Sequence, residues 1–296
     1  MPDHPTIDTA APPLTVVVSR GQSRHPEKRG LENAVVQLCE AIPGASVLSV
    51  PHLYDVPHRG DVARRLSAID GPIVVVSWIF ERAARWVLAR HGVATERQLR
   101  CIDLKDQPDP NRVADRVREQ IREQICEQGP GDPAAGLSVE RLEESTKRRW
   151  YPVIDFDRCT NCMECVDFCL FGVYGIDQRE SILVEQPDNC RKGCPACSRV
   201  CPENAIMFPQ HKAPAIAGAA VEDDAGFKID LSQLFGAPAT SDNDRLSTAA
   251  RERDEQLLLT GREAKGFDEQ LAALQRQAGP KDRWDDLIES LEAETL

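Results

Sequence analysis

Between residues 14 and 127, hydrophobic positions alternate between short apolar runs and longer amphipathic stretches. The apolar runs predict four strands, at Leu14–Val18, Ser46–Val50, Pro72–Ser77 and Leu99–Leu104. The amphipathic stretches predict four helices, at Lys28–Ala41, Gly60–Ala68, Ile79–His91 and Asn111–Glu127. Strands that alternate with helices form a parallel sheet with helices on both faces. We therefore expect an α/β domain over residues 14–127.

Outside this domain the pattern weakens in three places. Residues 1–13 are expected to be a disordered start. Gly and Pro residues are concentrated between Gly129 and Gly136, and they disfavour both helix and strand. We therefore expect residues 128–149 to hold a linker and a short charged helix, Ser138–Arg149. Ala213–Ala220 is predicted to be a second linker, and residues 214–296 form a helical or partly disordered acidic tail.

The tail contains one clear amphipathic segment, residues 282–293. Its apolar side chains recur at i, i+3, i+4 and i+7, and they are Trp284, Leu287, Ile288 and Leu291. Such a stripe has to be covered, either by the same chain or by a partner protein that binds the helix in a groove. Both possibilities stay open at this point.

Charge and targeting signals narrow the function. The 296-residue chain has a formal net charge of -12, and residues 221–296 contain 18 acidic and 9 basic residues, which makes -9 of it. The remainder is close to neutral, which argues against a nucleic-acid-binding surface. The sequence has no signal-peptide pattern and no apolar run of about 18 residues, so we expect a cytoplasmic protein without a membrane span. There, eleven cysteines indicate metal or redox chemistry.

Eight of the eleven cysteines form two regularly spaced runs. These are Cys159-x2-Cys162-x2-Cys165-x3-Cys169 and Cys190-x3-Cys194-x2-Cys197-x3-Cys201. A loop with Cys at every third position can place three thiolates around a 4Fe-4S cubane, whose fourth iron needs a more distant ligand. Structural zinc, disulfides and clusters that only hold the fold together are the alternatives. Triple Cys at this spacing fits cubanes better than tetrahedral zinc, which usually takes paired Cys or His.

With these runs, residues 150–213 resemble the bacterial two-cluster 4Fe-4S ferredoxins. The resemblance implies a ferredoxin-like α+β fold with two 4Fe-4S clusters, in which the last Cys of each run binds the other cluster. One cluster would be held by Cys159, Cys162, Cys165 and Cys201. The other would be held by Cys190, Cys194, Cys197 and Cys169. The sequence departs from the family pattern at Leu170, where Pro is usual, and in the longer loop between Cys190 and Cys194.

The flanks of the two runs agree with this fold. Tyr151–Asp155 can pair with Ala205–Pro209, and Gly172–Ile176 can form a hairpin with Ser181–Val184. We expect an apolar shell that limits water around the clusters, made of Ile154, Phe156, Phe168, Val173, Ile182, Ile206 and Phe208. Of the cysteines outside the two runs, Cys39 and Cys101 are expected to be small core residues.

The loops after the predicted strands of the N-terminal domain are rich in polar side chains. Ligands of parallel sheets bind outside the carboxyl ends of the strands. One interpretation is therefore a pocket for an anion or a metal-bearing ligand, and the other is a solvated polar surface. The candidate pocket residues are Arg20, Arg24, His25, His52 and His58. The sequence has no G-x-G-x-x-G and no P-loop, so no motif supports nicotinamide or ATP binding.

The first 90 residues carry a second, fainter resemblance. The order of a strand, Ser-Arg-Gly-Gln-Ser-Arg-His-Pro, a long helix and another strand is similar to the small α/β tetrapyrrole chelatases of the sirohydrochlorin cobaltochelatase type. A flavodoxin-like sheet is the other expectation for this domain. Arg20 stands near the position of that family's metal-handling His, so we carry over the fold and not the activity. His25 or His58 would be the residue to replace that His.

The leading functional prediction is an electron carrier, or an electron-transfer subunit, that passes electrons through two clusters to a partner oxidoreductase. The partner would dock through Trp284, Leu287, Ile288 and Leu291. One alternative is an enzyme whose α/β domain binds a tetrapyrrole or another small ligand, with the clusters as its electron supply. The other is a sensor whose clusters report oxygen or redox state without catalysis.

Overall fold

The computed structural model describes residues 14–93, 99–128, 138–219 and 242–266. The described residues divide into two compact units, an N-terminal unit of residues 14–149 and 212–219, and a cysteine-rich unit of residues 150–211 and 242–266. The predicted disordered start, the Gly- and Pro-rich linker and the amphipathic helix at 282–293 all lie outside the described residues.

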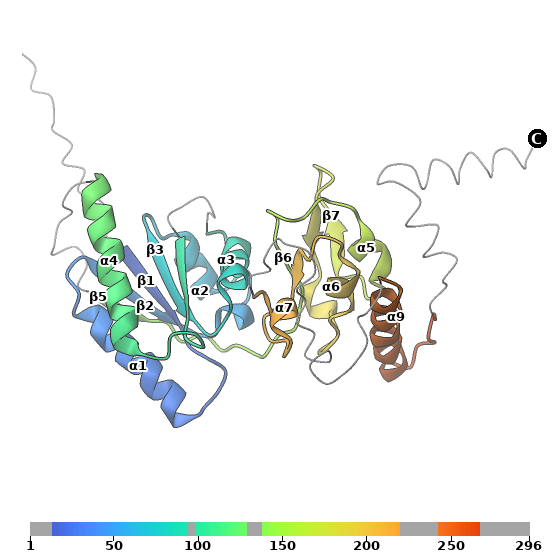
Figure 1. Ribbon diagram of the computed structural model, residues 1–296, viewed down its shortest axis with the longest axis horizontal. Coiled ribbons are helices and arrows are strands. Elements are labelled where there is room, and N and C mark those ends of the chain that lie inside the picture. The colour runs from blue at the N-terminus through green and yellow to red at the C-terminus, as the bar shows by residue number, and fades with distance from the viewer. Residues whose placement is uncertain (1–13, 94–98, 129–137, 220–241, 267–296) are drawn as a thin grey trace, which may run out of the picture. The chain divides into compact units, whose positions relative to one another are not determined.

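The N-terminal unit is built on a parallel five-stranded sheet with the order β4-β3-β1-β2-β5 (Figure 1). Its strands are β1 (Leu14–Ser19), β2 (Ala45–Val50), β3 (Ile73–Ser77), β4 (Leu99–Asp103) and β5 (Ser138–Arg141). The first four strands are confirmed within one residue or two of their predicted ends. Their order, β2-β1-β3-β4, is also the order in which a flavodoxin-like doubly wound sheet begins.

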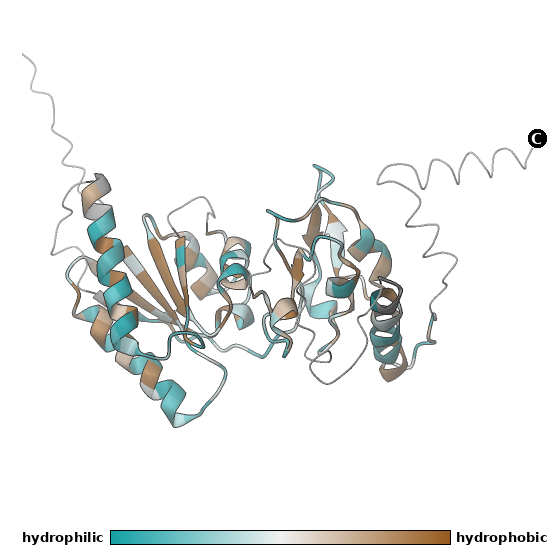
Figure 2. Ribbon diagram, viewed as in Figure 1, coloured by the Kyte–Doolittle hydropathy of each residue, from teal (hydrophilic) through white to brown (hydrophobic). Residues whose placement is uncertain are grey.

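Helices cover both faces of this sheet, as expected from the buried, mostly apolar central strands β1, β2 and β3. The long helices α1 (Pro26–Glu40) and α4 (Pro110–Gln128) pack together on one face. The shorter helices α2 (Asp61–Ser67) and α3 (Glu81–Arg90) lie on the other face. Figure 2 shows the apolar strands between these two layers of helices. A short 3-10 turn, Leu53–Asp55, follows β2.

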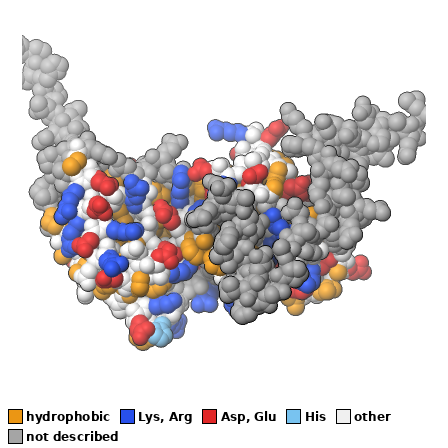
Figure 3. Space-filling model, viewed as in Figure 1, with side chains coloured by type: hydrophobic (Ala, Val, Ile, Leu, Met, Phe, Trp, Pro, Cys, Tyr) orange, Lys and Arg blue, Asp and Glu red, His pale blue; other side chains and the backbone are white. Residues whose placement is uncertain are grey.

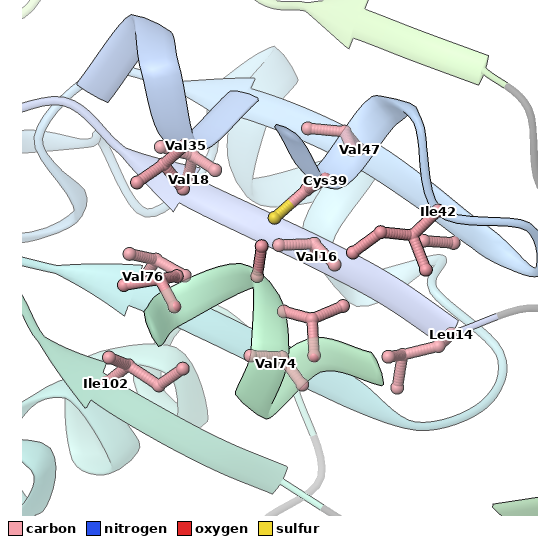
Figure 4. Close-up of a cluster of buried hydrophobic side chains, with 14 of the residues drawn as sticks. Leu14, Val16, Val18, Val35, Cys39, Ile42, Val47, Val74, Val76 and Ile102 are labelled. Carbon is pink, nitrogen blue, oxygen red and sulfur yellow. The ribbon is translucent and has the colours of Figure 1, made fainter. Parts of the chain in front are cut away.

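The core beneath α1 and α4 is formed by alternate residues of the strands. Val16 and Val18 of β1 pack against Val35 and Cys39 of α1, and all four are fully buried (Figure 4). The prediction that Cys39 is a core residue is therefore confirmed, and burial raises the pKa of its thiol to about 11. A protonated thiol behaves as a small apolar side chain, which suits this position.

The end of α3 places a histidine inside the same unit. His91 is only 3% exposed, and its Nε2 lies 3.2 Å from the carbonyl oxygen of Leu53. Gly92 follows with φ at 83°, which is the left-handed conformation predicted for the residue that ends this helix. Burial, as the largest cause, lowers the pKa of His91 to about 4.

The predicted helix Ser138–Arg149 is wrong. Residues Ser138–Arg141 form β5, which pairs in parallel with β2 from Ser46 to Ser49, and the chain after it is irregular. The strand with which it pairs is about 90 residues away in sequence, so the local pattern of charged residues does not predict this pairing. Charged side chains such as Glu140 and Arg141 are common on an edge strand, where they prevent further pairing. The strand extends the N-terminal unit to Arg149.

The cysteine-rich unit contains two small antiparallel pairs. Strand β6 (Val153–Ile154) pairs with β9 (Ile206–Met207), and β7 (Tyr174–Ile176) forms a hairpin with β8 (Ile182–Val184). Both pairings fall within the segments predicted to pair. Short helices α5 (Glu164–Phe168) and α6 (Ala196–Val200) follow the two cysteine loops and pack on each other, and a 3-10 turn, Pro187–Asn189, precedes the second loop.

Two segments after residue 213 differ from the sequence prediction. Within the predicted linker Ala213–Ala220, the structure has a short helix, α7 (Pro214–Ala217), begun by its proline and ended by Gly218 with φ at 103°. The second segment, helix α9 (Asp242–Leu259), packs against α6, so part of the acidic tail belongs to the core of the cysteine-rich unit. Its buried apolar residues are mostly Ala, which gives a weak periodic signal: Ala249, Ala250 and Leu257.

Candidate metal centres

The first cysteine run wraps around a small apolar cavity. The loop begins where the amide of Cys159 donates to the carbonyl oxygen of Asp155 at 3.0 Å, and it turns through two left-handed residues, Asn161 and Met163. The side chain of Asn161 ties the loop to the neighbouring hairpin by accepting a hydrogen bond from the amide of Ile182 at 2.9 Å. Three cysteines of this run line the cavity, namely Cys159, Cys162 and Cys165.

The fourth thiol at this cavity comes from the second run. Cys201 follows the last residue of α6, and its Sγ accepts a hydrogen bond from the amide of Ala205 at 3.3 Å. The remaining walls are largely apolar, with Ile154, Ile182 and Ile206. The cavity is therefore lined by cysteines of both runs and is protected from water by aliphatic side chains.

A second cavity has the reciprocal composition. It is lined by Cys190, Cys194 and Cys197 of the second run, together with Cys169, which follows the last residue of α5. The additional residue between Cys190 and Cys194 is absorbed in a turn, in which the amide of Cys194 donates to the carbonyl oxygen of Arg191 at 3.0 Å. Gly193 adopts φ of 88° in this turn, so the longer loop still carries both cysteines to the cavity.

Burial disfavours the thiolate form of several cysteines at these cavities. Burial raises the pKa of Cys165, and the neighbouring Cys201 raises it further. Burial likewise raises the pKa of Cys194 to about 11, and Cys169 adds to this effect. In each case one of the neighbours that disfavours the thiolate is the cysteine from the other run. A cationic iron would stabilise these thiolates, and sulfur donors in an apolar surrounding fit iron-sulfur chemistry.

Within the described residues, no three His, Cys, Asp or Glu side chains converge on a point that could hold one metal ion. Four cysteines instead line each cavity. A cubane takes one thiolate on each of its four irons, and this donor arrangement is compatible with that requirement.

Helix α9 contributes to the second cavity, which the sequence analysis did not anticipate. Its Ala249 is fully buried against Cys194 and Ala196, and Glu252 pairs with Arg199 of α6 at 2.8 Å. Arg253 lines the cavity, and its guanidinium carbon lies 4.7 Å from the ring centre of Phe168. Only the position of α9 in the fold identifies these residues, because their sequence pattern is that of a charged surface helix.

The predicted apolar shell is mostly present. Five of its seven members are buried, namely Ile154, Val173, Ile182, Ile206 and Phe208, and Phe168 packs against this part of the core. Phe156 was wrongly placed in the shell, since it is 49% exposed. The strand β6 ends at Ile154, and the chain turns at Asp155 before Phe156, so the strand alternation does not reach it.

In the N-terminal unit, three of the five candidate pocket residues line one cavity: Arg20, Arg24 and His52. This cavity lies at the carboxyl ends of β1, β2 and β5, which are neighbours in the sheet. The other two candidates, His25 and His58, are exposed and are not part of its lining. Arg141 and Arg148 line the cavity from β5 and the segment after it, which the sequence analysis missed because β5 was not predicted.

Comparison with known proteins identifies relatives of the cysteine-rich unit. An uncharacterized ferredoxin of Methanocaldococcus jannaschii is 46% identical over 77 residues, which cover 24% of this chain and 52% of the relative. The chain thus spans about half the length of that relative. A ferredoxin of Methanothermococcus thermolithotrophicus is 40% identical over 59 residues, covering 19% of this chain and 95% of the relative.

A third relative is named as part of an enzyme. The pyruvate synthase subunit PorD of Methanocaldococcus jannaschii is 36% identical over 71 residues, which cover 24% of this chain and 79% of that subunit. No protein-family model and no solved structure matches the chain. In the part of the chain that the structure describes, no helix combines the length and the apolar character needed to cross a membrane.

Proposed function

This chain belongs to the ferredoxin family, and from that premise we propose that it transfers electrons through two 4Fe-4S clusters and delivers them to a partner oxidoreductase. The main support is the pair of cavities, each lined by four cysteines of which one comes from the other run. The first cluster would be held by Cys159, Cys162, Cys165 and Cys201, and the second by Cys190, Cys194, Cys197 and Cys169.

When bound, such clusters supply reversible one-electron chemistry at potentials that depend on burial, hydrogen bonding and nearby charge. The residues of this chain do the rest. Eight thiolates hold the irons, and the aliphatic and aromatic walls exclude water. Because α5 and α6 pack together and each is followed by a cysteine at the opposite cavity, both sites lie within one small unit, which suits transfer from one to the other.

The first test counts the clusters. The full chain is purified without oxygen, iron and acid-labile sulfide are quantified, and EPR spectra are recorded during a reductive titration. We expect about eight iron and eight sulfide per chain, with coupled signals from two reduced cubanes. About four iron per chain, or zinc in place of iron, would contradict the two-cluster relay.

The second test assigns the ligands with two double variants that remove the same number of cysteines. If the fourth ligands are exchanged, Cys162→Ala/Cys169→Ala damages both clusters, whereas Cys169→Ala/Cys194→Ala damages only the second and leaves about four iron in an intact cubane. If each run binds its own cluster, the two results are reversed. Cys126→Ala is the control, since this exposed cysteine lies outside both cavities and should leave about eight iron.

The identity of the partner is a further part of the proposal. One relative is named as a subunit of pyruvate synthase, which supports a role beside a larger oxidoreductase. We predict docking through Trp284, Leu287, Ile288 and Leu291. Chemical cross-linking of the reduced protein, followed by mass spectrometry, tests this prediction. Replacement of Trp284 by Ala should weaken the partner interaction at least several-fold and leave the iron content unchanged.

The second candidate function is an enzyme that combines a ligand site in the N-terminal unit with the clusters as its electron supply. It is favoured by one observation, the cavity at the carboxyl edge of the parallel sheet, which is where ligands of such sheets bind. In that case, a ligand of this cavity should be consumed when the clusters are reduced. Product analysis after reductive titration in the presence of the ligand distinguishes this function from simple electron transfer.

A further inference from the structure

The cavity at the carboxyl edge of the N-terminal sheet has an unusual concentration of arginine. It measures about 1020 Å³ and is open to solvent. Its lining is mostly polar and includes five arginines against four carboxylates: Arg20, Arg24, Arg29, Arg141 and Arg148, with Glu32, Asp55, Glu143 and Glu144. On the face of this unit seen in Figure 3, acidic and basic side chains are likewise interspersed.

Two of the arginines are already paired within the protein. Arg29 bonds to buried Glu32 at 2.8 Å, and Glu32 also accepts hydrogen bonds from the amide of Gly21 at 2.7 Å and the indole of Trp78 at 2.8 Å. Arg20 bonds to Glu143 at 2.7 Å and to the carbonyl oxygen of Leu142 at 2.9 Å. These pairs hold the loop after β1 and the segment after β5 in place.

The other two carboxylates accept hydrogen bonds within the protein. Asp55 is 4% exposed and accepts hydrogen bonds from the side chain of Gln22 at 2.5 Å and the amide of Arg149 at 3.0 Å. Glu144 accepts from the amide of Val62 at 3.2 Å. All four acidic side chains of the cavity therefore have hydrogen-bond donors within the protein.

Three cations of the cavity remain without a carboxylate partner among the described residues. Arg141 has only a weak contact with the side-chain oxygen of Asn33, at 3.4 Å. Arg24 and Arg148 make no ion pair with any described residue, and both are exposed at the cavity. Unpaired guanidinium groups that share one cavity are suited to bidentate binding of phosphate or carboxylate groups.

A buried histidine supplies a further unused polar atom. The side chain of His52 lines the cavity and is 10% exposed. Its Nδ1 lies 3.7 Å from Oδ2 of Asp55 but has no hydrogen-bond partner among the described residues. Buried polar atoms are almost always paired in native proteins, so an unpaired one at a cavity wall indicates a missing ligand or water. Burial lowers the pKa of His52, which leaves a neutral ring able to donate or accept one hydrogen bond.

We propose that this cavity binds a small polyvalent anion, with two or more phosphate or carboxylate groups held by Arg24, Arg141 and Arg148 and a polar group beside His52. Its volume is that of a small-molecule site, and its polar lining excludes an apolar ligand. The site lies entirely within the N-terminal unit, so it is independent of the clusters and of their proposed function.

The experiment is a calorimetric titration of the cluster-loaded, full-length protein with pyrophosphate and, separately, with citrate, at low and at high salt. Binding of either anion, weakened by salt, supports the site. Pyrophosphate alone identifies a phosphate ligand, citrate alone a carboxylate ligand, and both together a site that recognises charge density. Absence of measurable binding by both anions at low salt overturns the proposal.

Variants assign the binding to this cavity. Arg24→Gln/Arg148→Gln removes two exposed cations, and we expect a loss of about tenfold or more in affinity, because each charge-assisted hydrogen bond contributes that much. Arg122→Gln is the matched control, an exposed arginine on α4 outside the cavity. Equal affinity of the double variant and the wild type would overturn the assignment. Iron content, measured in the same samples, separates this result from any loss of clusters.

Discussion

Burial of a neutral histidine gives the N-terminal unit a defined response to acid. Burial is the largest cause of the fall in the pKa of His91 from 6.5 to about 4. The hydrogen bond to Leu53 opposes this fall, and the nearby Arg90, His58 and Arg149 add to it. Below pH 6.5 the unfolded chain binds a proton at this residue, whereas the folded unit does so only near pH 4. The contribution of neutral His91 to the free energy of unfolding is therefore fully present above pH 6.5, and it is lost as the pH falls towards 4.

The size of this effect follows from the two pKa values. The full difference between 6.5 and about 4 corresponds to about 3 kcal/mol, since one pKa unit is about 1.4 kcal/mol. Between pH 7 and pH 5, the free energy of unfolding should fall by about 2 kcal/mol through this residue. In His91→Gln, the amide can still donate to the carbonyl oxygen of Leu53, but the titrating group is gone, so this part of the pH dependence should disappear.

The assay has to report on the N-terminal unit alone, because a chain with two units and bound clusters does not unfold in one step. Hydrogen exchange of the β1 and β3 amides, followed by mass spectrometry across a urea series at pH 7 and pH 5, meets this need. His25→Gln is the control, since that side chain is 59% exposed. Equal pH dependence in His91→Gln and the wild type, or an NMR titration of the His91 ring near pH 6.5, would refute the reasoning.

Three further predictions concern packing and backbone geometry. Leu257→Ala removes a fully buried side chain of α9, so it should destabilise the cysteine-rich unit by about 2–5 kcal/mol and speed the decay of visible cluster absorbance in air. In Gly193→Ala, the added Cβ meets no neighbouring atom, but the alanine has to adopt φ of 88°, which costs about 1–2 kcal/mol of conformational free energy. This variant should alter the EPR signal of the second cluster and not that of the first. Glu32→Gln replaces a carboxylate that accepts three hydrogen bonds by a neutral amide with a single acceptor oxygen. Hydrogen exchange should show that the free energy of unfolding of the N-terminal unit falls by about 1–3 kcal/mol.

Local patterns in the sequence predicted most of the fold. The strands β1 to β4 and the helices between them are encoded by short-range periodicity, and their buried faces, such as that of Val16 and Val18, follow from it. The cysteine spacing likewise predicted which eight thiols gather, because three of each four come from one continuous loop. Their assignment to individual irons stays a prediction.

The parts that escaped prediction depend on partners distant in sequence. Strand β5 forms because its backbone pairs with the free edge of β2. Since this pairing was not predicted, the positions of Arg141 and Arg148 at the cavity were not predicted either. Helix α9 is held by Ala249 and Leu257, whose burial requires the surface of α6. Small side chains such as Ala249 can be recognised as part of a helix contact only when the surface that packs against them is known.

The position of α9 also affects the order in which the protein can mature. The ribosome completes the cysteines of both runs by residue 201, but Arg253, which lines the second cavity, and Ala249, which packs on Cys194, are synthesised about 50 residues later. During that interval, a nascent chain has the thiols of both sites but lacks α9, so the second cavity is open on the side that α9 will cover. If the second cavity holds the cluster proposed for it, its thiols stay accessible to donors of iron and sulfide, and to oxidants, until α9 has been made.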